Sequence, residues 1–333
     1  MADRRFLIVR LGSLGDIIHT LPASAALRDS FPNAQIDWVV ESQWVPILDG
    51  NPDLNSVIPL DRSSTASVLD SVACLRSAHY TSALDFQSLY KSALLARAAG
   101  AKEVLGFDWN YAREGPASLL YTWRIHPVGA HKVEHNLALA EAAGAQRAAP
   151  RFTLPQSREA DEWISEQLDR SGLSDFYVIS PGGGWRSKCW PAERFGELHG
   201  ELARRYGLRG VVSFDPGEDA LAKEVVEAAG DAAPISLAMD LSQLMALLRR
   251  AKFAVAADTG PLHLAAALGT PVVGLYGPTD PARNGPFSNR AVVVRKALPE
   301  ETTYKRGTSY SAAMLRIEVE DAVSAVSQIA EKG

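Results

Sequence analysis

The sequence has few of the features that mark disulfide-rich, metal-binding or membrane-spanning proteins. Among its 333 residues are only two cysteines, Cys74 and Cys189, and no CxxC pair, which argues against a disulfide scaffold or a structural zinc site. The apolar run near the N-terminus, residues 6–9, is too short for the core of a signal peptide. No uninterrupted apolar run approaches the roughly 18 residues of a transmembrane helix. These features together predict a cytoplasmic protein.

Neither sign of charge dominates, and several common catalytic motifs are missing. With 34 basic and 39 acidic residues the net charge is −5, so the basic face of a general nucleic-acid-binding protein is not expected. The chain has no GxxxxGK[ST] phosphate loop, no HExxH, no Asp-x-Asp and no GxSxG nucleophile elbow. Charge stabilisation at a reaction centre would then come from helix dipoles and side-chain cations, without requiring a metal.

Short β-branched runs alternate with helical patterns, which is typical of a parallel α/β sheet. Strands are predicted at residues 6–9, 36–40, 57–58, 83–86 and 104–105, and then at 176–180, 210–214, 253–256 and 271–275. Because each half opens with a strand that runs into a glycine-rich turn, we expect two doubly wound Rossmann-like domains, 1–155 and 156–333, facing a central cleft. A last helix near 319–331 could pack on either domain, the N-terminal one included.

The first glycine-rich turn, residues 12–16, ends in Asp16 near the start of a helix. Asp16 could be a helix N-cap, or it could be a general base that faces the cleft. A further alternative is a nicotinamide-dependent oxidoreductase, in which this turn binds the dinucleotide and Glu41 follows the second strand. The full Gly-x-Gly-x-x-Gly fingerprint of that class is missing.

Two segments of the second half are candidates for binding a phosphorylated sugar. In residues 257–263, Pro261 suits the first turn of a helix, whose free N–H groups would favour a phosphate. Asp258 could bind sugar hydroxyls, although helix capping is the simpler role for Asp258 and Thr259, and His263 could equally be structural. Lys188, after glycines 182–184, could neutralise a leaving phosphate or could be a solvated surface lysine.

The same segments resemble a known family. Residues 258–263 with 269–271 and 276–281, together with 15–16 and 188–191, are similar to the lipopolysaccharide heptosyltransferases, which have the two-domain GT-B architecture. The chain resembles most the heptosyltransferase I type, on residues 38–41, 87–93 and 108–114. This type adds the first heptose to the Kdo of lipid A.

The resemblance implies an inverting, metal-independent transfer that needs no cofactor. The donor would be ADP-L-glycero-β-D-manno-heptose, bound by the C-terminal domain, and the acceptor would be Kdo–lipid A, bound by the N-terminal domain. Asp16 is the implied base. The implied donor-binding residues are Lys188, Asp258, Thr259, Gly260, Leu262, His263 and Glu218, and the implied acceptor-binding residues are Lys91, Arg113 and His131.

Two departures from the family pattern and two alternatives accompany this expectation. Residues 61–67 hold one arginine, Arg62, where the family has several basic residues, and glycines stand at 182–184 in place of hydroxyl-bearing residues. The acceptor could therefore be a heptose or another sugar, or the chain could bind a sugar nucleotide without catalysis.

Residues 116–124 mix apolar, aromatic and basic side chains, and could contact the inner membrane peripherally or form a buried helix.

Overall fold

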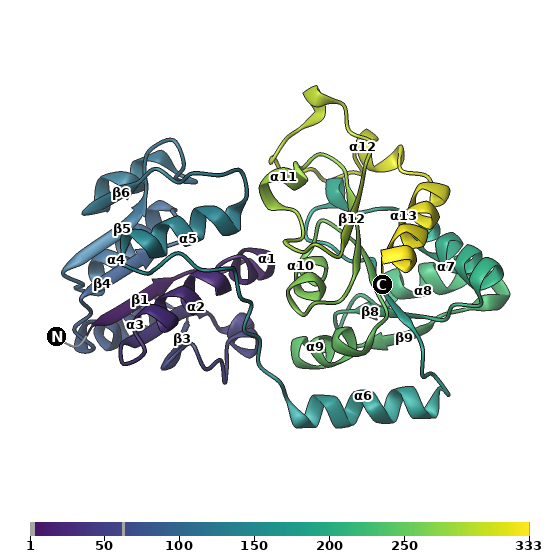
Figure 1. Cartoon of the computed structure of the whole chain (residues 1–333), viewed down its shortest axis with the longest axis horizontal. Helices are drawn as coiled ribbons and strands as arrows, with labels where there is room; N and C mark the ends of the chain where they lie inside the picture. Colours follow the sequence, from purple (N-terminus) through teal and green to yellow (C-terminus); the bar gives the residue numbers. More distant parts are fainter. Residues whose placement is uncertain (1–3, 62–63, 333) are drawn as a thin grey trace. The chain divides into compact units, whose positions relative to one another are not determined.

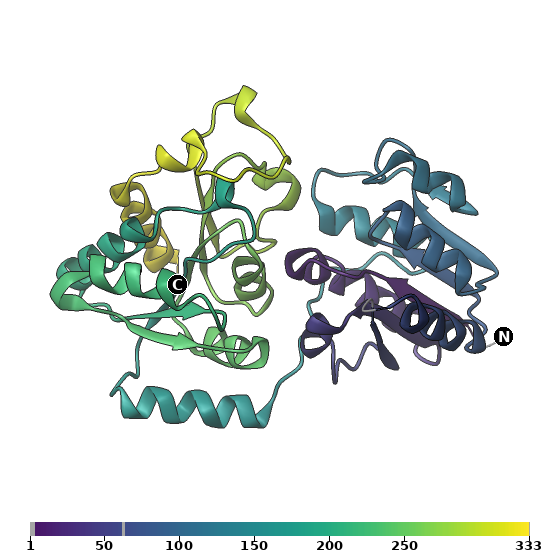
Figure 2. The same ribbon diagram turned by 180° about the vertical axis from the view of Figure 1, so that it is seen from behind.

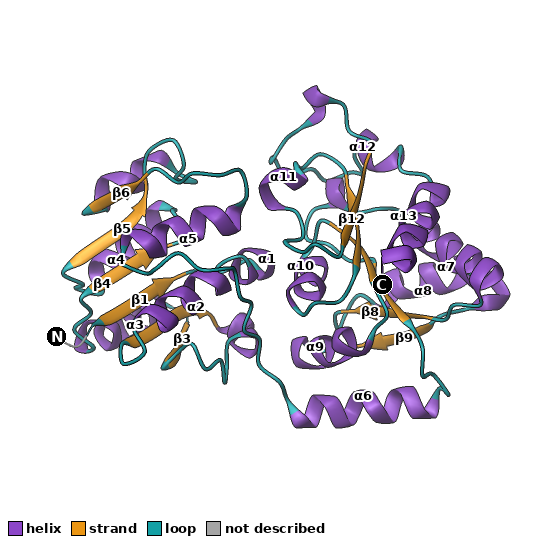
Figure 3. Cartoon of the chain, viewed as in Figure 1, coloured by secondary structure: helices purple, strands orange, loops and turns teal. Residues whose placement is uncertain are grey.

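The computed structural model describes residues 4–61 and 64–332, and the chain divides into two compact units, Met1–Pro155 and Gln156–Gly333. Arg62 lies outside the described residues. Each unit has one sheet of six parallel strands with helices on both faces, as Figure 3 shows for the strands in orange and the helices in purple. No helix among the described residues is long and apolar enough to cross a bilayer.

The N-terminal unit is built on a sheet with the strand order β3-β2-β1-β4-β5-β6. Its central strand β1 carries four consecutive buried apolar residues, which is the pattern of a parallel strand covered on both faces. The elements are β1 (Arg5–Val9), α1 (Leu14–Ile18), α2 (Leu21–Ser30), β2 (Gln35–Glu41), η1 (Ser42–Ile47), β3 (Ser56–Leu60), α3 (Thr65–Ser77), β4 (Ser82–Asp85), α4 (Tyr90–Ala98), β5 (Glu103–Phe107), η2 (Gly115–Leu120), β6 (Trp123–Ile125) and α5 (Lys132–Ala142), where η denotes a 3-10 helix.

The C-terminal unit repeats this plan with the order β12-β11-β10-β7-β8-β9. Its core includes the buried Trp190 and Phe195, whose rings pack edge to face 5.0 Å apart. The elements are α6 (Arg158–Arg170), β7 (Tyr177–Ser180), η3 (Arg186–Lys188), α7 (Ala192–Tyr206), β8 (Gly210–Phe214), α8 (Asp219–Ala228), η4 (Gly230–Ala232), β9 (Ile235–Ala238), α9 (Leu241–Arg250), β10 (Ala254–Ala257), α10 (Gly260–Ala267), β11 (Val272–Tyr276), α11 (Pro281–Asn284), β12 (Ala291–Arg295), η5 (Pro299–Glu301), α12 (Ala312–Leu315) and α13 (Val319–Lys332).

Both sheets therefore have the doubly wound order 3-2-1-4-5-6, and every strand pair is parallel. In such sheets ligands bind beyond the carboxyl ends of the strands, where the winding direction reverses. That point lies between β1 and β4 in the first unit and between β7 and β10 in the second. The segments that follow these four strands contain Asp16 in α1, Lys91 in α4, Lys188 in η3 and Asp258 directly after β10.

The last helix joins the C-terminal unit. Figures 1 and 2 show α13 beside α7 and β12, and it also packs on β11. Its residues Ala322, Val323 and Val326 are buried in the core of that unit. The alternative, packing on the N-terminal domain, is therefore wrong, because the apolar stripe of α13 fits the face of the second sheet.

Three strands were not predicted from the sequence, namely β6, β9 and β12. All three are edge strands of their sheets, and their residues are exposed or only partly buried. The interpretation of residues 116–124 as one buried helix is also wrong. The segment forms η2 and the start of β6, with Ala117 and Tyr121 buried and Leu119 and Trp123 exposed.

Candidate active site

Asp16 lies in α1, directly beyond the turn that follows β1. Its carboxylate forms an ion pair with Arg10, at 2.5 Å from Oδ1 to Nη2, and accepts a hydrogen bond from the hydroxyl of Ser13 at 3.3 Å. The N-cap position of α1 is held by Ser13. The capping role considered for Asp16 is therefore wrong, and about a third of its side chain stays open to solvent, at 33% relative exposure.

The electrostatic surroundings of Asp16 keep it ionised. Burial would raise the pKa of Asp16, but the nearby cationic groups of Arg10, His19, Arg113 and Lys132 outweigh it and hold the pKa below its usual value. An ionised carboxylate is the form that can accept a proton from an attacking hydroxyl. The arrangement suits a general base.

Arg10, which sequence reasoning missed, is fixed in place by the protein interior. The residue is buried, its Nη1 donates to the backbone carbonyl of Phe86 at 2.6 Å, and its own carbonyl accepts from the indole of Trp38 at 3.0 Å. Because the guanidinium is anchored to Phe86 and the backbone of the same residue to Trp38, Arg10 sets the orientation of the Asp16 carboxylate. The signal in the sequence is a charged residue directly after the apolar run of β1.

The loop after β4 leads into α4, which carries Lys91, and it is held by the fully buried Asp85. The carboxylate of Asp85 accepts hydrogen bonds from the backbone N–H groups of Gln87 and Ser88 and from the hydroxyls of Ser92 and Tyr121. Burial raises the pKa of Asp85 above its usual value, and these four donors offset part of the cost. Asp85 thus fixes the start of α4.

The three predicted acceptor-binding residues have different surroundings. Arg113 is exposed and is close enough to Asp16 to lower its pKa. His131 is the N-cap of α5, where its Nδ1 accepts from the N–H of Val133, and its ring packs edge-on against His19 at 5.2 Å. Lys91 is exposed in the first turn of α4, and no contact joins it to this group. The structure therefore brings Arg113 and His131, but not Lys91, to the surroundings of Asp16.

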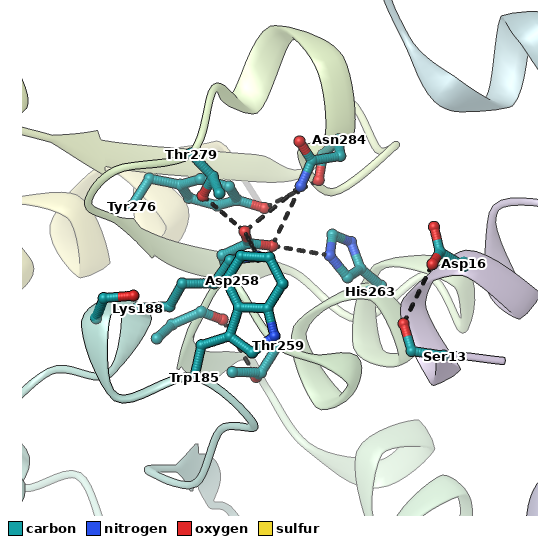
Figure 4. A network of polar contacts seen from close by, with 12 residues as sticks. Ser13, Asp16, Trp185, Lys188, Asp258, Thr259, His263, Tyr276, Thr279 and Asn284 are labelled. Atoms are coloured by element: carbon teal, nitrogen blue, oxygen red, sulfur yellow. Dashed lines mark hydrogen bonds and ion pairs between the residues drawn. The ribbon is translucent and has the colours of Figure 1, made fainter. Parts of the chain in front are cut away.

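In the C-terminal unit, polar side chains from separate elements converge on Asp258, which follows β10 (Figure 4). Its carboxylate accepts hydrogen bonds from Lys188 Nζ and Thr279 Oγ1, each at 2.6 Å. His263 Nε2 lies 3.3 Å from Oδ1, and Asn284 Nδ2 lies 3.4 Å from Oδ2. The Lys188 side chain is only 16% exposed, so the surface-lysine alternative is wrong.

Asp258 is a buried and fully engaged anion. Burial would raise the pKa of Asp258, but the hydrogen bonds and charges of His263 and Lys188 outweigh that effect and hold the pKa far below its ordinary value. Both oxygens accept from protein donors, and the side chain is only 3% exposed, which restricts the access of a sugar hydroxyl. The carboxylate therefore positions Lys188, His263 and the loop that carries Thr279 and Asn284.

The N-terminus of α10 is open to an anion. Thr259 holds the N-cap position, but its hydroxyl donates to the carbonyl of Ala257 and does not cap the helix. Thr259 is thus the N-cap residue without a side-chain cap, and the carboxylate of Asp258 bonds to other side chains. Gly260 and Leu262 have N–H groups in this first turn, and Pro261 has none. Since the Leu262 side chain is fully buried, only its backbone can reach a ligand.

The glycine turn after β7 packs closely against this helix start. A Cβ on Gly183 would lie 2.9 Å from Thr259 Cγ2 and 3.0 Å from Cys189 Sγ, so a side chain there would push the turn away. A Cβ on Gly182 would lie 2.7 Å from a carboxylate oxygen of Glu218, which places Glu218 beside the turn. The structure thus gathers all seven predicted donor-binding residues around one turn and one helix end.

Sequence reasoning missed Thr279 and Asn284 as members of this group. Both lie in the loop and short helix after β11, far from Asp258 along the chain. For Thr279 a signal was its place in residues 276–281, which carry the family resemblance. For Asn284 it was position, because β11 is the neighbour of β10 in the sheet and its carboxyl end lies at the same edge.

Comparison with known proteins now gives the family. Residues 71–313 match the family model described as glycosyltransferase family 9 (heptosyltransferase). Lipopolysaccharide heptosyltransferase 1 of Salmonella typhimurium is 35% identical over 301 residues, covering 85% of this chain and 91% of that protein. The chain belongs to glycosyltransferase family 9. It is a heptosyltransferase, which decides against the oxidoreductase and the non-catalytic binding protein.

Further relatives agree with this assignment. Lipopolysaccharide heptosyltransferase 1 of Pseudomonas aeruginosa is 33% identical, covering 92% of this heptosyltransferase and 88% of the relative. Among solved structures, the E. coli heptosyltransferase WaaC with ADP is 28% identical and has a TM-score of 0.77, covering 98% of this chain and 99% of that chain. The two six-stranded parallel sheets thus form the GT-B fold of these enzymes.

Proposed function

We propose that this heptosyltransferase moves L-glycero-D-manno-heptose from ADP-heptose to a Kdo residue of the lipid A-linked inner core, with inversion at the anomeric carbon. The observation that carries the proposal is the ionised Asp16, fixed by Arg10 at the carboxyl end of β1. The donor is supported by the family and by a similar enzyme, WaaC, whose structures contain ADP or ADP-2-deoxy-2-fluoro heptose.

The reaction would be a single displacement. The acceptor oxygen attacks the anomeric carbon, its proton passes to Asp16, and the bond from that carbon to the diphosphate breaks as ADP leaves. Lys188 and the N–H groups at the start of α10 would offset the charge that grows on the leaving diphosphate. In this scheme Asp16 is the base, and Lys188, which pairs with Asp258, stabilises the leaving group.

An anionic acceptor fits the charges around Asp16. Arg113 and Lys132 act on the Asp16 carboxylate, and His131 lies against His19. Several positively charged groups thus surround one carboxylate, and an acceptor that brings its own carboxylate matches this charge pattern. Kdo has such a carboxylate, whereas a heptose has none and carries negative charge only when it is phosphorylated.

The test is the turnover of Asp16→Asn over a panel of acceptors. We expect kcat with ADP-heptose and Kdo–lipid A to fall by about 10²–10⁴, because the base is lost while donor binding remains. The control is Asp29→Asn, an exposed carboxylate in the same unit. Full activity of D16N would remove Asp16 from the mechanism, and faster turnover with a heptose-bearing acceptor than with Kdo–lipid A would overturn the acceptor assignment.

Contact with the membrane surface that holds such an acceptor is part of the same proposal. Leu119 and Trp123 are exposed, and Arg124 is exposed beside them in β6. Apolar and basic side chains together favour an anionic bilayer surface. We expect flotation with anionic liposomes to be reduced in Leu119→Ser/Trp123→Ser, and equal flotation of both proteins would argue against this contact.

A further inference from the structure

Residues 302–310, here called the basic segment, link two parts of the donor side. Near one end, the N–H of Thr303 donates to the carbonyl of Pro278 at 2.8 Å, in the loop that carries Thr279. In the second half of the segment, the N–H of Gly307 donates to the hydroxyl of Ser187 at 3.3 Å. Ser187 lies in η3, beside Lys188. A Cβ on Gly307 would lie 2.8 Å from Ser187 Cβ, so the contact is close. The basic segment is thus fastened to both elements that meet at Asp258.

Stacking of cations on aromatic rings fixes the side chains of the basic segment. Within the segment, Tyr304 lies under the guanidinium of Arg283 at 4.5 Å, and Tyr310 lies under that of Arg186 at 4.0 Å. Cation–π contacts of this kind are individually modest but hold orientation. The two rings therefore fasten the segment to α11 and to η3.

Arg306 shares the ring of Trp185 with Lys188. The ammonium of Lys188 is 4.4 Å from the centre of that ring, and the guanidinium carbon of Arg306 is 5.6 Å from it. Lys188 has a counter-ion, Asp258, but no carboxylate among the described residues lies within ion-pair distance of the exposed Arg306. One indole ring therefore holds two cations and only one of them is neutralised.

The surroundings leave room for an anion. Residues 182–184 are glycines, so the turn after β7 offers no side-chain donor, and a Cβ on Gly184 would meet open space. The start of α10 beside this turn has no side-chain cap. An uncompensated guanidinium near a turn without side chains and an open helix end is suited to a phosphate group.

We propose that Arg306 is a second cation for the diphosphate of the nucleotide-sugar donor, acting with Lys188. This inference rests on the proposed function, because it assumes a nucleoside diphosphate sugar as the donor. When the bond from the anomeric carbon to the diphosphate breaks, the electron pair stays on the leaving phosphate oxygen. Arg306 stabilises that added charge, and its planar guanidinium can bind two phosphate oxygens at once.

The test is calorimetric titration of the full chain with ADP and with AMP, using Arg306→Gln, Arg306→Lys and the wild type. We expect R306Q to bind ADP about tenfold more weakly, with a smaller change for AMP, because AMP lacks the second phosphate. R306K should recover part of the affinity. In turnover, R306Q should lower kcat/KM for the donor and leave KM for the acceptor unchanged, which a loosened fold would not do.

The matched control is Arg158→Gln, which removes the same charge from an exposed position on α6. If R306Q binds ADP as tightly as R158Q does, the role of Arg306 is overturned while the proposed function stands. If the wild type binds ADP but R306Q loses affinity for AMP and ADP equally, Arg306 does not act on the second phosphate. If the wild type binds neither ADP nor ADP-heptose, the proposed function itself fails and this inference falls with it.

Discussion

Replacing Asp258 by asparagine tests whether one buried anion organises the donor side. The substitution keeps the size of the side chain and removes its charge. Lys188, whose side chain is only 16% exposed, then keeps its ammonium group without a counter-ion, and His263 and Thr279 face a weaker acceptor. Removing one partner of a buried pair typically costs about 3–5 kcal/mol, and the lower value suits a lysine that is not fully buried.

A loss of about 3 kcal/mol lowers Tm by roughly 6–12 °C in a domain of this size. Differential scanning calorimetry of the full chain would measure the change in the transition of the C-terminal unit. The control is Asp175→Asn, which breaks the pair with Lys252 at 3.2 Å where both side chains are at least half exposed. An exposed pair contributes little, so the Tm of D175N should change by no more than about 2 °C.

The pH dependence of Tm is a second test of the role of Asp258. The pKa of Asp258 in the folded chain lies below its value in the unfolded chain. Its contribution to the free energy of unfolding is therefore complete above about pH 5 and is lost as the pH falls through the folded pKa. The difference in Tm between the wild type and D258N should therefore shrink between pH 5 and pH 3.

In D258N, replacing the unpaired Lys188 should also restore part of the lost stability. The double variant D258N/K188M should be more stable than D258N, because no unpaired ammonium remains. If D258N loses no more Tm than D175N at pH 7, the carboxylate does not organise these residues and the reasoning is wrong.

Three further predictions concern other groups. Arg10→Gln should raise the pKa of Asp16 and move the acid limb of the kcat/KM profile to higher pH, whereas an unmoved limb would show that Arg10 does not tune the base. Gly183→Ala should destabilise the turn by about 1–3 kcal/mol and raise KM for the donor, while Gly184→Ala, with open space at its Cβ, should do neither in kinetic and melting assays. Burial lowers the pKa of His199, so this imidazole binds a proton more readily in the unfolded chain than in the folded one. Lowering the pH from 7 to 5.5 should therefore lower the Tm of the wild type, and it should lower the Tm of His199→Gln by less.

Most of the strands that the sequence predicts are buried on both faces. The predicted strand at 210–214 has the same bounds as β8, the one at 6–9 begins one residue later than β1, and the one at 271–275 is shifted by one residue from β11. Continuous apolar runs mark such strands because helices cover both faces of a parallel sheet. The missed strands β6, β9 and β12 are edge strands that are exposed or only partly buried, and β6 and β9 have no such run. β12 has an apolar run at 291–294, and the edge strand β3 was predicted at 57–58, so prediction was complete only for the inner strands.

The candidate site shows a different limit. Lys188, Asp258 and Thr259 each follow a strand or a glycine turn, so their positions along the chain pointed to the sheet edge. Whether a charge at that edge is open or already neutralised depends on contacts between distant segments, as for Arg10 with Asp16. Asp258 is the sharper case, because its position suggested a ligand for sugar hydroxyls while its four donors come from η3, α10 and the segment after β11. A carboxylate so fully bonded holds other groups in place, so the ligand contacts on this side should come from the groups it arranges, Lys188 above all.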